Sequence, residues 1–355
     1  MLRRPVAAAV AIVLSGCGAA TASAPRATPL PPLATPAPPA RPPLVAIIDG
    51  NARMLRLVDL DGAEVASAVT SDSFVRTTVA GASLLYVDGH LVRSLQRDGT
   101  VQEVGSLRDS LGGIVASPDG DQWIWSEETS PTSDVYTTRV VAGGRGAAPH
   151  LIATHKEPLH WIAPLAWTEH GVVVDHVPGG IGGRPTFPDD TVFATSHLDP
   201  TAGDLSDFTS ESCHLLDVRK DGTVLCRKGG AGTPVVLAIQ APGGRGRDVT
   251  FPGDVVDIGR ARPVPGTTVE GFGVARHGSS ADDLVYQTLT IDLAGGAPHP
   301  FGPRGLEPLQ WLPDGRLVAI RPNTVGGDPG TYLVAADGVS TTKLSAVPDA
   351  VAVLE

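Results

Sequence analysis

Short apolar runs separated by polar, glycine-containing turns fill the chain from residue 44 onward. The clearest unit lies near the C-terminus, where the apolar run Leu309–Leu312 is followed by the turn Pro313–Gly315 and a second run, Arg316–Arg321. In such a turn the proline presets φ, the aspartate caps the turn and the glycine accepts a positive φ. Two more strand-like segments follow, Gly330–Val334 and Val339–Leu344. The pattern predicts a unit of four short antiparallel strands.

Similar turns recur along the chain and indicate a repeat. Their glycines are 31, 51, 51, 44 and 49 residues apart, at Gly89, Gly120, Gly171, Gly222, Gly266 and Gly315. We assign Leu84–Gly89 to the first strand and turn of its unit. A four-stranded unit of roughly 40–50 residues predicts a β-propeller, because no single unit can bury its own apolar face.

The predicted fold class is therefore all-β, with a single β-propeller of four-stranded blades over residues 44–355. The first unit has three strand-like runs between residues 44 and 69, and the segment Asp349–Leu354 has no partner of its own. Pairing of this segment inside the first blade closes the ring and protects the sheet edges. The composite blade brings the count to seven, while six or eight blades are also compatible with the irregular loops between Leu159 and Thr209.

Tryptophans in the repeats are predicted to fill the core. Trp123 and Trp125 alternate on one strand and so point to the same face, with Ile124 on the other. Trp167 and Trp311 occupy equivalent positions, four residues before a turn glycine. Packing between adjacent blades explains these positions better than an exposed stacking platform for a sugar.

Residues 1–16 have the organisation of an export signal. Arg3 and Arg4 precede the apolar run Val6–Leu14, which is shorter than the ~20 residues of a membrane-spanning helix. The segment Leu14–Cys17 is similar to the lipobox of bacterial lipoproteins, and this resemblance implies cleavage before Cys17 and its acylation, including palmitate. The alternative is an ordinary signal peptide with an incidental cysteine.

Residues 17–43 are predicted to form a disordered tether between the lipidated cysteine and the propeller. Nine prolines lie between Gly18 and Pro43, with Arg26 and Arg41 as the charged residues of that segment. Such a composition cannot pack a core and favours extended polyproline geometry. The expected location is therefore outside the cytoplasm, lipid-anchored to the bacterial cell membrane or envelope, with the membrane contacted through the N-terminal lipid.

The net charge of the mature chain limits the kinds of partner it can bind. Removal of the signal leaves 25 basic and 38 acidic residues, a formal charge of −13, which argues against nucleic acid as a partner. A monomer that binds an unknown protein or small molecule is expected.

Cys213 and Cys226 flank one turn of an exported chain, so a disulfide is predicted, and two buried free thiols are the alternative.

The repeats resemble those of the TolB-type, WD-like β-propeller family. The turns Ser117–Gly120 and Leu312–Gly315, with the continuation Gly330–Val334, carry this resemblance. It implies an extracytoplasmic propeller that presents protein- or ligand-binding surfaces. TolB itself carries an α/β domain before its propeller, whereas a proline-rich segment takes that place here.

Motifs for catalysis or cofactors are not found in the sequence. There is no Gly-x-Ser-x-Gly elbow, no His-Glu-x-x-His motif and no phosphate-binding glycine-rich loop, and no cofactor is expected. Closely spaced carboxylates such as Asp59 with Asp61 and Asp119 with Asp121 are interpreted as Asp-Gly turns in preference to calcium loops. Weak metal candidates are five histidines within 27 residues, none of whose intervals matches a known zinc spacing: His150, His155, His160, His170 and His176.

A long glycine-rich segment between Pro178 and Thr191 is the best candidate for a binding loop, although a tolerated insertion explains it equally well. Its candidate residues are Gly180, Arg184, Asp189 and Asp190.

The favoured function is a non-catalytic, membrane-anchored lipoprotein whose propeller is a binding scaffold. One alternative is a propeller enzyme acting on glycans, which needs two carboxylates or a carboxylate–His set facing one cavity. The other is a metal or small-ligand sensor.

Overall fold

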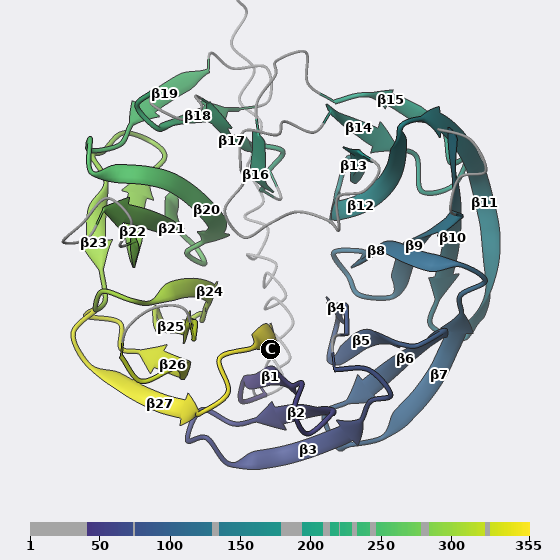
Figure 1. The fold of residues 1–355 in the computed structure, drawn as a ribbon, viewed down its shortest axis with the longest axis horizontal. Helices are drawn as coiled ribbons and strands as arrows, with labels where there is room; N and C mark the ends of the chain where they lie inside the picture. Colours follow the sequence, from purple (N-terminus) through teal and green to yellow (C-terminus); the bar gives the residue numbers. More distant parts are fainter. Residues whose placement is uncertain are drawn as a thin grey trace, which may run out of the picture. The chain divides into compact units, whose positions relative to one another are not determined.

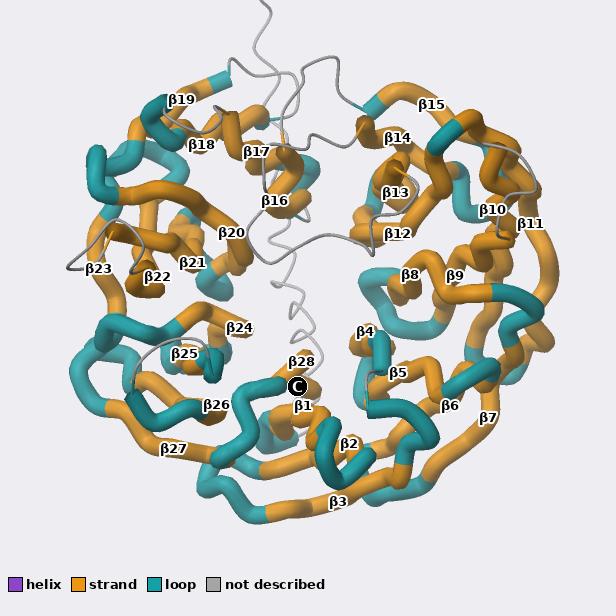
Figure 2. Tube along the Cα trace, viewed as in Figure 1, coloured by secondary structure: helices purple, strands orange, loops and turns teal. Residues whose placement is uncertain are grey.

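The computed structural model describes residues 41–73, 75–129, 135–178, 194–208, 214–219, 221–228, 233–241, 246–277, 284–323 and 327–355. Within these ranges the chain forms 28 strands in seven four-stranded antiparallel sheets. The sheets of the unit 41–355 follow one another around a ring, as the blades of a propeller (Figure 1). Figure 2 shows the alternation of strand and loop in each blade. The predicted all-β propeller with seven blades is confirmed.

Blades 1 to 4 each consist of four strands, named in order from the axis of the ring outwards. Blade 1 contains β28 (Ala350–Leu354), β1 (Leu44–Asp49), β2 (Met54–Val58) and β3 (Glu64–Val69). Blade 2 contains β4 (Thr77–Ala80), β5 (Ser83–Asp88), β6 (Leu91–Gln96) and β7 (Val101–Ser106). Blade 3 contains β8 (Ser110–Ala116), β9 (Gln122–Thr129), β10 (Val135–Gly144) and β11 (Ala147–Pro158). Blade 4 contains β12 (His160–Thr168), β13 (Gly171–Pro178), β14 (Ala194–Leu198) and β15 (Leu205–Asp207).

The remaining three blades follow the same order. Blade 5 contains β16 (His214–Val218), β17 (Val224–Lys228), β18 (Val236–Gln240) and β19 (Arg247–Thr250). Blade 6 contains β20 (Val255–Pro263), β21 (Val269–His277), β22 (Leu284–Asp292) and β23 (His299–Phe301). Blade 7 contains β24 (Glu307–Trp311), β25 (Leu317–Arg321), β26 (Gly330–Val334) and β27 (Thr341–Ser345).

The ring is closed inside blade 1 by strands from the two ends of the propeller. β28 pairs with β1 in antiparallel register, with Val353 opposite Val45 and Leu354 opposite Leu44. Both pairs are buried, so the closure is held by apolar packing as well as by the strand ladder. The predicted closure by the C-terminal segment is confirmed.

The assignment of the second unit was wrong by one strand. Leu84–Asp88 belongs to β5, the second strand of blade 2, and Gly89 lies in the turn after it. The glycine equivalent to the other turn glycines is Gly81, which has φ +57° and follows β4. β4 has only four residues, of which Thr77 and Thr78 are polar. It is therefore too short and too polar to be recognised as a strand from the pattern of apolar residues. From Gly81 to Gly120 the interval is 39 residues, close to the expected repeat.

Apolar faces of adjacent blades pack against each other, as the tryptophan pattern predicts. Trp123 and Trp125 of β9 pack with Leu85 of blade 2, while Ile124 faces the opposite way and packs with Val172 of blade 4. Trp311 of blade 7 is buried against Phe301 of blade 6, with ring centroids 4.4 Å apart. The buried tryptophan pair on β9 is confirmed.

Candidate functional site

Several predicted site residues lie outside the described residues, so their predictions stay untested. They are Cys17, Cys213, Gly180, Arg184, Asp189 and Asp190. Cys226 is described; it is buried in β17 opposite Leu215. Among the described residues no helix is long and apolar enough to cross a membrane.

The five candidate histidines do not converge. His150 and His155 lie on β11, His160 on β12, His170 in the turn before β13 and His176 on β13. Within the described ranges no three His, Cys, Asp or Glu side chains are grouped so as to hold a metal ion.

The first aspartate of each acidic turn accepts hydrogen bonds from the backbone of its own turn. Asp59 Oδ1 accepts hydrogen bonds from the amides of Asp61 (3.0 Å) and Ala63 (2.8 Å). Asp119 Oδ1 accepts from the amide of Asp121 at 3.0 Å. The geometry is that of Asp-Gly turns.

One histidine does meet a carboxylate, across the boundary between blades 3 and 4. His176 Nδ1 lies 2.6 Å from Glu157 Oε2, and His176 Nε2 lies 2.7 Å from Ser196 Oγ. A carboxylate, a histidine and a serine in this order form the chain that activates a nucleophile in hydrolases. Here Ser196 is only 9% exposed, and it lines none of the cavities of about 800, 660 and 330 Å³ in the described part of the chain. The side chains of Glu157, His176 and Ser196 therefore form a polar bridge between two blades.

A cluster of buried charges lies where β16, β20 and β21 meet. Arg219, just after β16, donates from Nη1 to Glu270 Oε2 at 2.6 Å and from Nη2 to the carbonyl of Thr267 at 3.1 Å. Glu270 lies on β21 opposite Pro263 of β20 and is 0% exposed. Its Oε1 has no hydrogen-bond partner among the described residues.

Burial controls the protonation of this cluster. The pKa of Glu270 is raised to about 8, by burial first and by the charge of Asp217 second, while Arg219 opposes the shift. The pKa of Asp217 is also raised, again by burial, and the cations Arg262 and Arg219 oppose that shift. These two neighbouring carboxyl groups thus hold their protons more tightly than the same groups do in water.

A cavity of about 660 Å³ opens beside the cluster. It lies at the ends of β16, β20 and β24 and directly after β28, so the innermost strands of blades 5, 6, 7 and 1 all end at it. Its lining is Asp217, Val218, Arg219, Asp221, Arg262, Pro263, Val264, Pro265, Gly266, Gln310, Trp311 and Glu355.

The two arginines of this cavity are already engaged. Arg219 is paired with Glu270, and Arg262 donates from Nε to the carbonyl of Leu309 (2.7 Å) and from Nη1 to its neighbour Ala261 (2.9 Å). Asp217 lines the cavity and makes no salt bridge within 4.0 Å in the described part of the chain. The cavity therefore presents a carboxylate whose charge is not neutralised by direct contact.

These residues were missed by the sequence analysis. The available signal was a single charged residue inside an apolar run, as for Glu270 in Val269–Ala275 and Asp217 after Leu215 and Leu216. A lone charge in a strand is usually solvent-facing, so only the packing of blade 5 against blade 6 distinguishes it from a surface residue.

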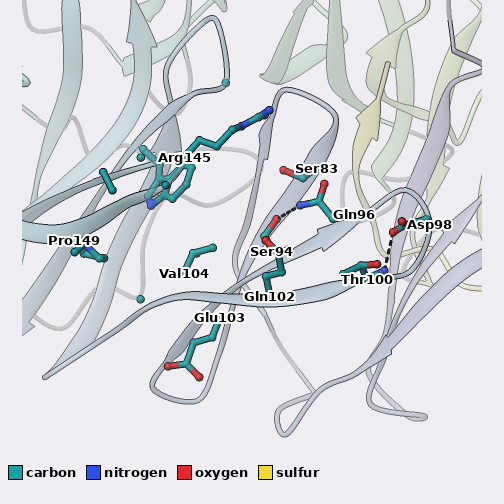
Figure 3. Close-up of a pocket in the computed structure, with 17 residues that line it drawn as sticks. Ser83, Ser94, Gln96, Asp98, Thr100, Gln102, Glu103, Val104, Arg145 and Pro149 are labelled. Atoms are coloured by element: carbon teal, nitrogen blue, oxygen red, sulfur yellow. Dashed lines mark hydrogen bonds between the residues drawn. The ribbon is translucent and has the colours of Figure 1, made fainter.

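A second, larger cavity of about 800 Å³ lies between blades 2 and 3 (Figure 3). In Figure 3, Ser94 and Gln96 are joined by a hydrogen bond, and Asp98 is bonded to Thr100. Arg145 extends from blade 3 toward the strand that carries Ser83.

The protein is therefore a seven-bladed β-propeller with cavities of ligand size where its blades meet. No family model matches this chain, and no curated protein matches it. Solved structures do. The β-propeller domain of the Trilobed protease from Pyrococcus furiosus aligns with a TM-score of 0.55 and 12% identity over 83% of this chain and 88% of that one. That domain is described as having an open velcro topology, whereas the ring of this chain is closed by β28 and β1.

Two further structures have similar folds. Pyrococcus horikoshii acylaminoacyl peptidase aligns with a TM-score of 0.56 and 11% identity over 85% of this chain and 50% of that one, so this chain spans half of that enzyme. An oligogalacturonate lyase from Vibrio parahaemolyticus aligns with a TM-score of 0.54 and 11% identity over 82% and 90% of the two chains. At these identities the similarity establishes the propeller fold alone.

Proposed function

We propose that this propeller is a binding scaffold, and that the cavity beside Asp217 takes a small ligand with a cationic group next to an apolar segment. The observation that carries the proposal is the Asp217 carboxylate, which faces the cavity without a salt bridge to any described residue. The apolar segment would contact Pro263, Val264 and Trp311.

Charge favours a cation over an anion. The lining contains three carboxyl side chains, Asp217, Asp221 and Glu355, against two guanidinium groups, Arg219 and Arg262, which already donate to Glu270 and to backbone carbonyls. An ammonium group beside Asp217 would stabilise its ionised form and lower its raised pKa. Binding of an amine is therefore expected to strengthen as the pH rises through the pKa of Asp217. The volume of about 660 Å³ lies within the range of small-molecule sites.

Binding is better supported than catalysis at this cavity. Acid–base catalysis on a glycan requires two carboxyl groups that both reach the substrate. Glu270, whose pKa suits a general acid at neutral pH, is fully buried behind Arg219 and does not line the cavity. Asp217 remains as a binding group.

The ligand test uses three molecules of one shape and different charge: 2-phenylethylamine, 2-phenylethanol and 3-phenylpropionate. Isothermal titration calorimetry at pH 7.5 should detect the amine and not the carboxylate. Asp217→Asn should weaken amine binding at least tenfold, because it removes the charge and keeps the shape. Asp61→Asn, in an exposed turn of blade 1, is the matched control and should bind as the unmodified protein does. Equal binding of amine and carboxylate, or unchanged binding by the Asp217→Asn variant, would contradict the proposal.

We further propose that the scaffold is exported and anchored through Cys17, with residues 17–43 as its tether. Support comes from the export signal and the Leu14–Cys17 segment. Labelled palmitate should be incorporated by the unmodified protein and not by a Cys17→Ala variant, which should move from the membrane to the soluble fraction.

A disulfide between Cys213 and Cys226 is part of the same proposal, and non-reducing peptide mapping tests it. A monomer is expected on size-exclusion chromatography.

A further inference from the structure

The cavity between blades 2 and 3 has a lining unlike that of the site beside Asp217. It is formed by the outer three strands of blade 2, by β9, β10 and β11 of blade 3, and by the turns between them. Its lining is Ser83, Ser94, Gln96, Asp98, Thr100, Gln102, Glu103, Val104, Gly105, Gly120, Trp123, Gly144, Arg145, Gly146, Ala147, Ala148 and Pro149. Small residues from blade 3 leave the space open, and hydroxyl and amide side chains from blade 2 face it.

The inner part of this lining is polar and uncharged. Ser83 and Ser94 are buried, at 7% and 4% exposure, and Gln96 donates from Nε2 to Ser94 Oγ at 2.9 Å. Gln102 on the neighbouring strand β7 stands opposite Ser94 in the ladder. Hydroxyl and amide groups in this arrangement offer both donors and acceptors to a ligand.

Trp123 forms one wall of the cavity. It lines the cavity at 6% exposure, and its Nε1 is a buried donor without a hydrogen-bond partner among the described residues. Gly143 on the next strand lies so close that a Cβ there would be 2.3 Å from Nε1. Because Nε1 is itself covered beside Gly143, Trp123 contributes an apolar wall to the cavity and not a hydrogen-bond donor.

The charged residues of the cavity are at its rim and mostly occupied. Asp98 Oδ1 accepts a hydrogen bond from the amide of Thr100 at 2.9 Å. Arg145 Nε lies 3.3 Å from Asp121 Oδ1, and both side chains are largely exposed. Glu103 is exposed and points away from Ser94 in Figure 3. All three charged side chains of the lining are exposed, whereas the hydroxyl groups of Ser83 and Ser94 belong to buried residues.

We propose that this cavity is a second binding site and that it takes an uncharged, polyhydroxylated ligand, a segment of an oligosaccharide. Sugar hydroxyls both donate and accept, and so they match the Ser94, Gln96 and Gln102 side chains without bringing charge into the cavity. A purely apolar ligand would leave the Gln102 amide, and the hydrogen-bonding capacity that Ser94 and Gln96 do not use on each other, without partners at a cost for each. The volume of about 800 Å³ lies within the range of small-molecule sites.

The test titrates the full chain with four neutral tetrasaccharides, namely maltotetraose, cellotetraose, xylotetraose and chitotetraose. Calorimetry should detect at least one of them, accompanied by a change in tryptophan fluorescence. Ala148→Trp is the blocking variant, since Ala148 is exposed on β11 and a large ring there fills the cavity without disturbing the core. It should weaken binding at least tenfold, and Gln102→Ala, also at an exposed position, should weaken it severalfold.

Two controls separate this site from general effects and from the other cavity. Thr341→Trp places the same ring on the exposed outer strand of blade 7 and should leave oligosaccharide binding unchanged. Asp217→Asn should also leave it unchanged, so the two proposed sites succeed or fail separately. Absence of binding by all four neutral sugars, or binding that Ala148→Trp leaves intact, would overturn the proposal. Tighter binding of tetragalacturonate than of every neutral sugar would overturn it as well, because a charged ligand would then be preferred.

Discussion

Glu157 and His176 belong to neighbouring blades, and their side chains meet at 2.6 Å between Oε2 and Nδ1. Glu157 comes from the outermost strand of blade 3 and His176 from the second strand of blade 4. His176 Nε2 lies 2.7 Å from Ser196 Oγ. The imidazole thus links a carboxylate of blade 3 to a hydroxyl group of blade 4. Elsewhere adjacent blades are held together mainly by apolar side chains.

Removal of this bridge should destabilise the propeller. Glu157→Ala leaves His176 Nδ1 without its acceptor in a half-buried position, and we expect a loss of about 1–3 kcal/mol in the free energy of unfolding. Urea denaturation measures it. Lys156→Ala, at the exposed neighbouring position, should change stability by less than about 0.5 kcal/mol. A double-mutant cycle with His176→Phe should give a coupling energy above about 0.5 kcal/mol; additive effects would show that the two residues do not interact.

Stability should fall as the pH rises from about 5 to 8, because Glu270 binds its proton more tightly in the folded state. Its pKa is raised from 4.5 to about 8, so between these values the folded protein holds a proton that the unfolded chain releases. The full stabilising effect is present below pH 4.5 and is lost as the pH passes about 8. The slope expected from this one proton is at most roughly 1.4 kcal/mol per pH unit.

The variant Glu270→Gln isolates this contribution. Its urea midpoint should depend less on pH over the same interval, while Glu103→Gln, at an exposed position, should follow the unmodified protein. Asp217→Asn should reduce the slope in the same direction, since the pKa of Asp217 is raised too. A midpoint that rises with pH, and does so less in Glu270→Gln, would mean that the ion pair with Arg219 outweighs burial.

Closure of the ring predicts a large effect at the C-terminal strand. Leu354 is fully buried in blade 1 opposite Leu44, and Leu354→Ala should cost about 2–5 kcal/mol. Val351→Ala, on the same strand but only partly buried, is the control and should cost less. Equal, small effects at both positions would show that β28 contributes little to the stability of the ring. Thermal and urea denaturation provide the measurement.

Two glycines with the same backbone angle should respond differently to a methyl group. Gly120 and Gly146 both have φ +73°, but a Cβ at Gly120 would lie 2.0 Å from the backbone nitrogen of Gly81, whereas nothing described lies within 4 Å of one at Gly146. Gly146→Ala should cost about 1 kcal/mol from φ alone. Gly120→Ala should cost about 2–4 kcal/mol, since the turn of blade 3 must also move away from that of blade 2. Denaturation in urea compares the two variants, and equal losses would argue against close contact of these turns.

The architecture of this protein could be read from the sequence because it depends on local chemistry. Alternating apolar residues and turns such as Pro313–Gly315 specify strands and hairpins over a few residues, and their repetition implies neighbours to bury each sheet. The fourth strand of blade 1 was also predictable, as Asp349–Leu354 had no local partner. Prediction failed at β4, where four residues with two threonines carry no apolar pattern and are placed by the blades beside them.

The candidate sites were decided by tertiary structure alone. Asp217 and Glu270 are 53 positions apart, and Glu157 lies in a different blade from His176 and Ser196. Nothing in a strand's own pattern states which residue of the next blade it will face, because that depends on how whole sheets pack around the ring. The same packing removes water from Glu270 and raises its pKa, a property that no local stretch of sequence contains. Repetition along the chain thus determined the fold, and contacts between repeats determined the chemistry.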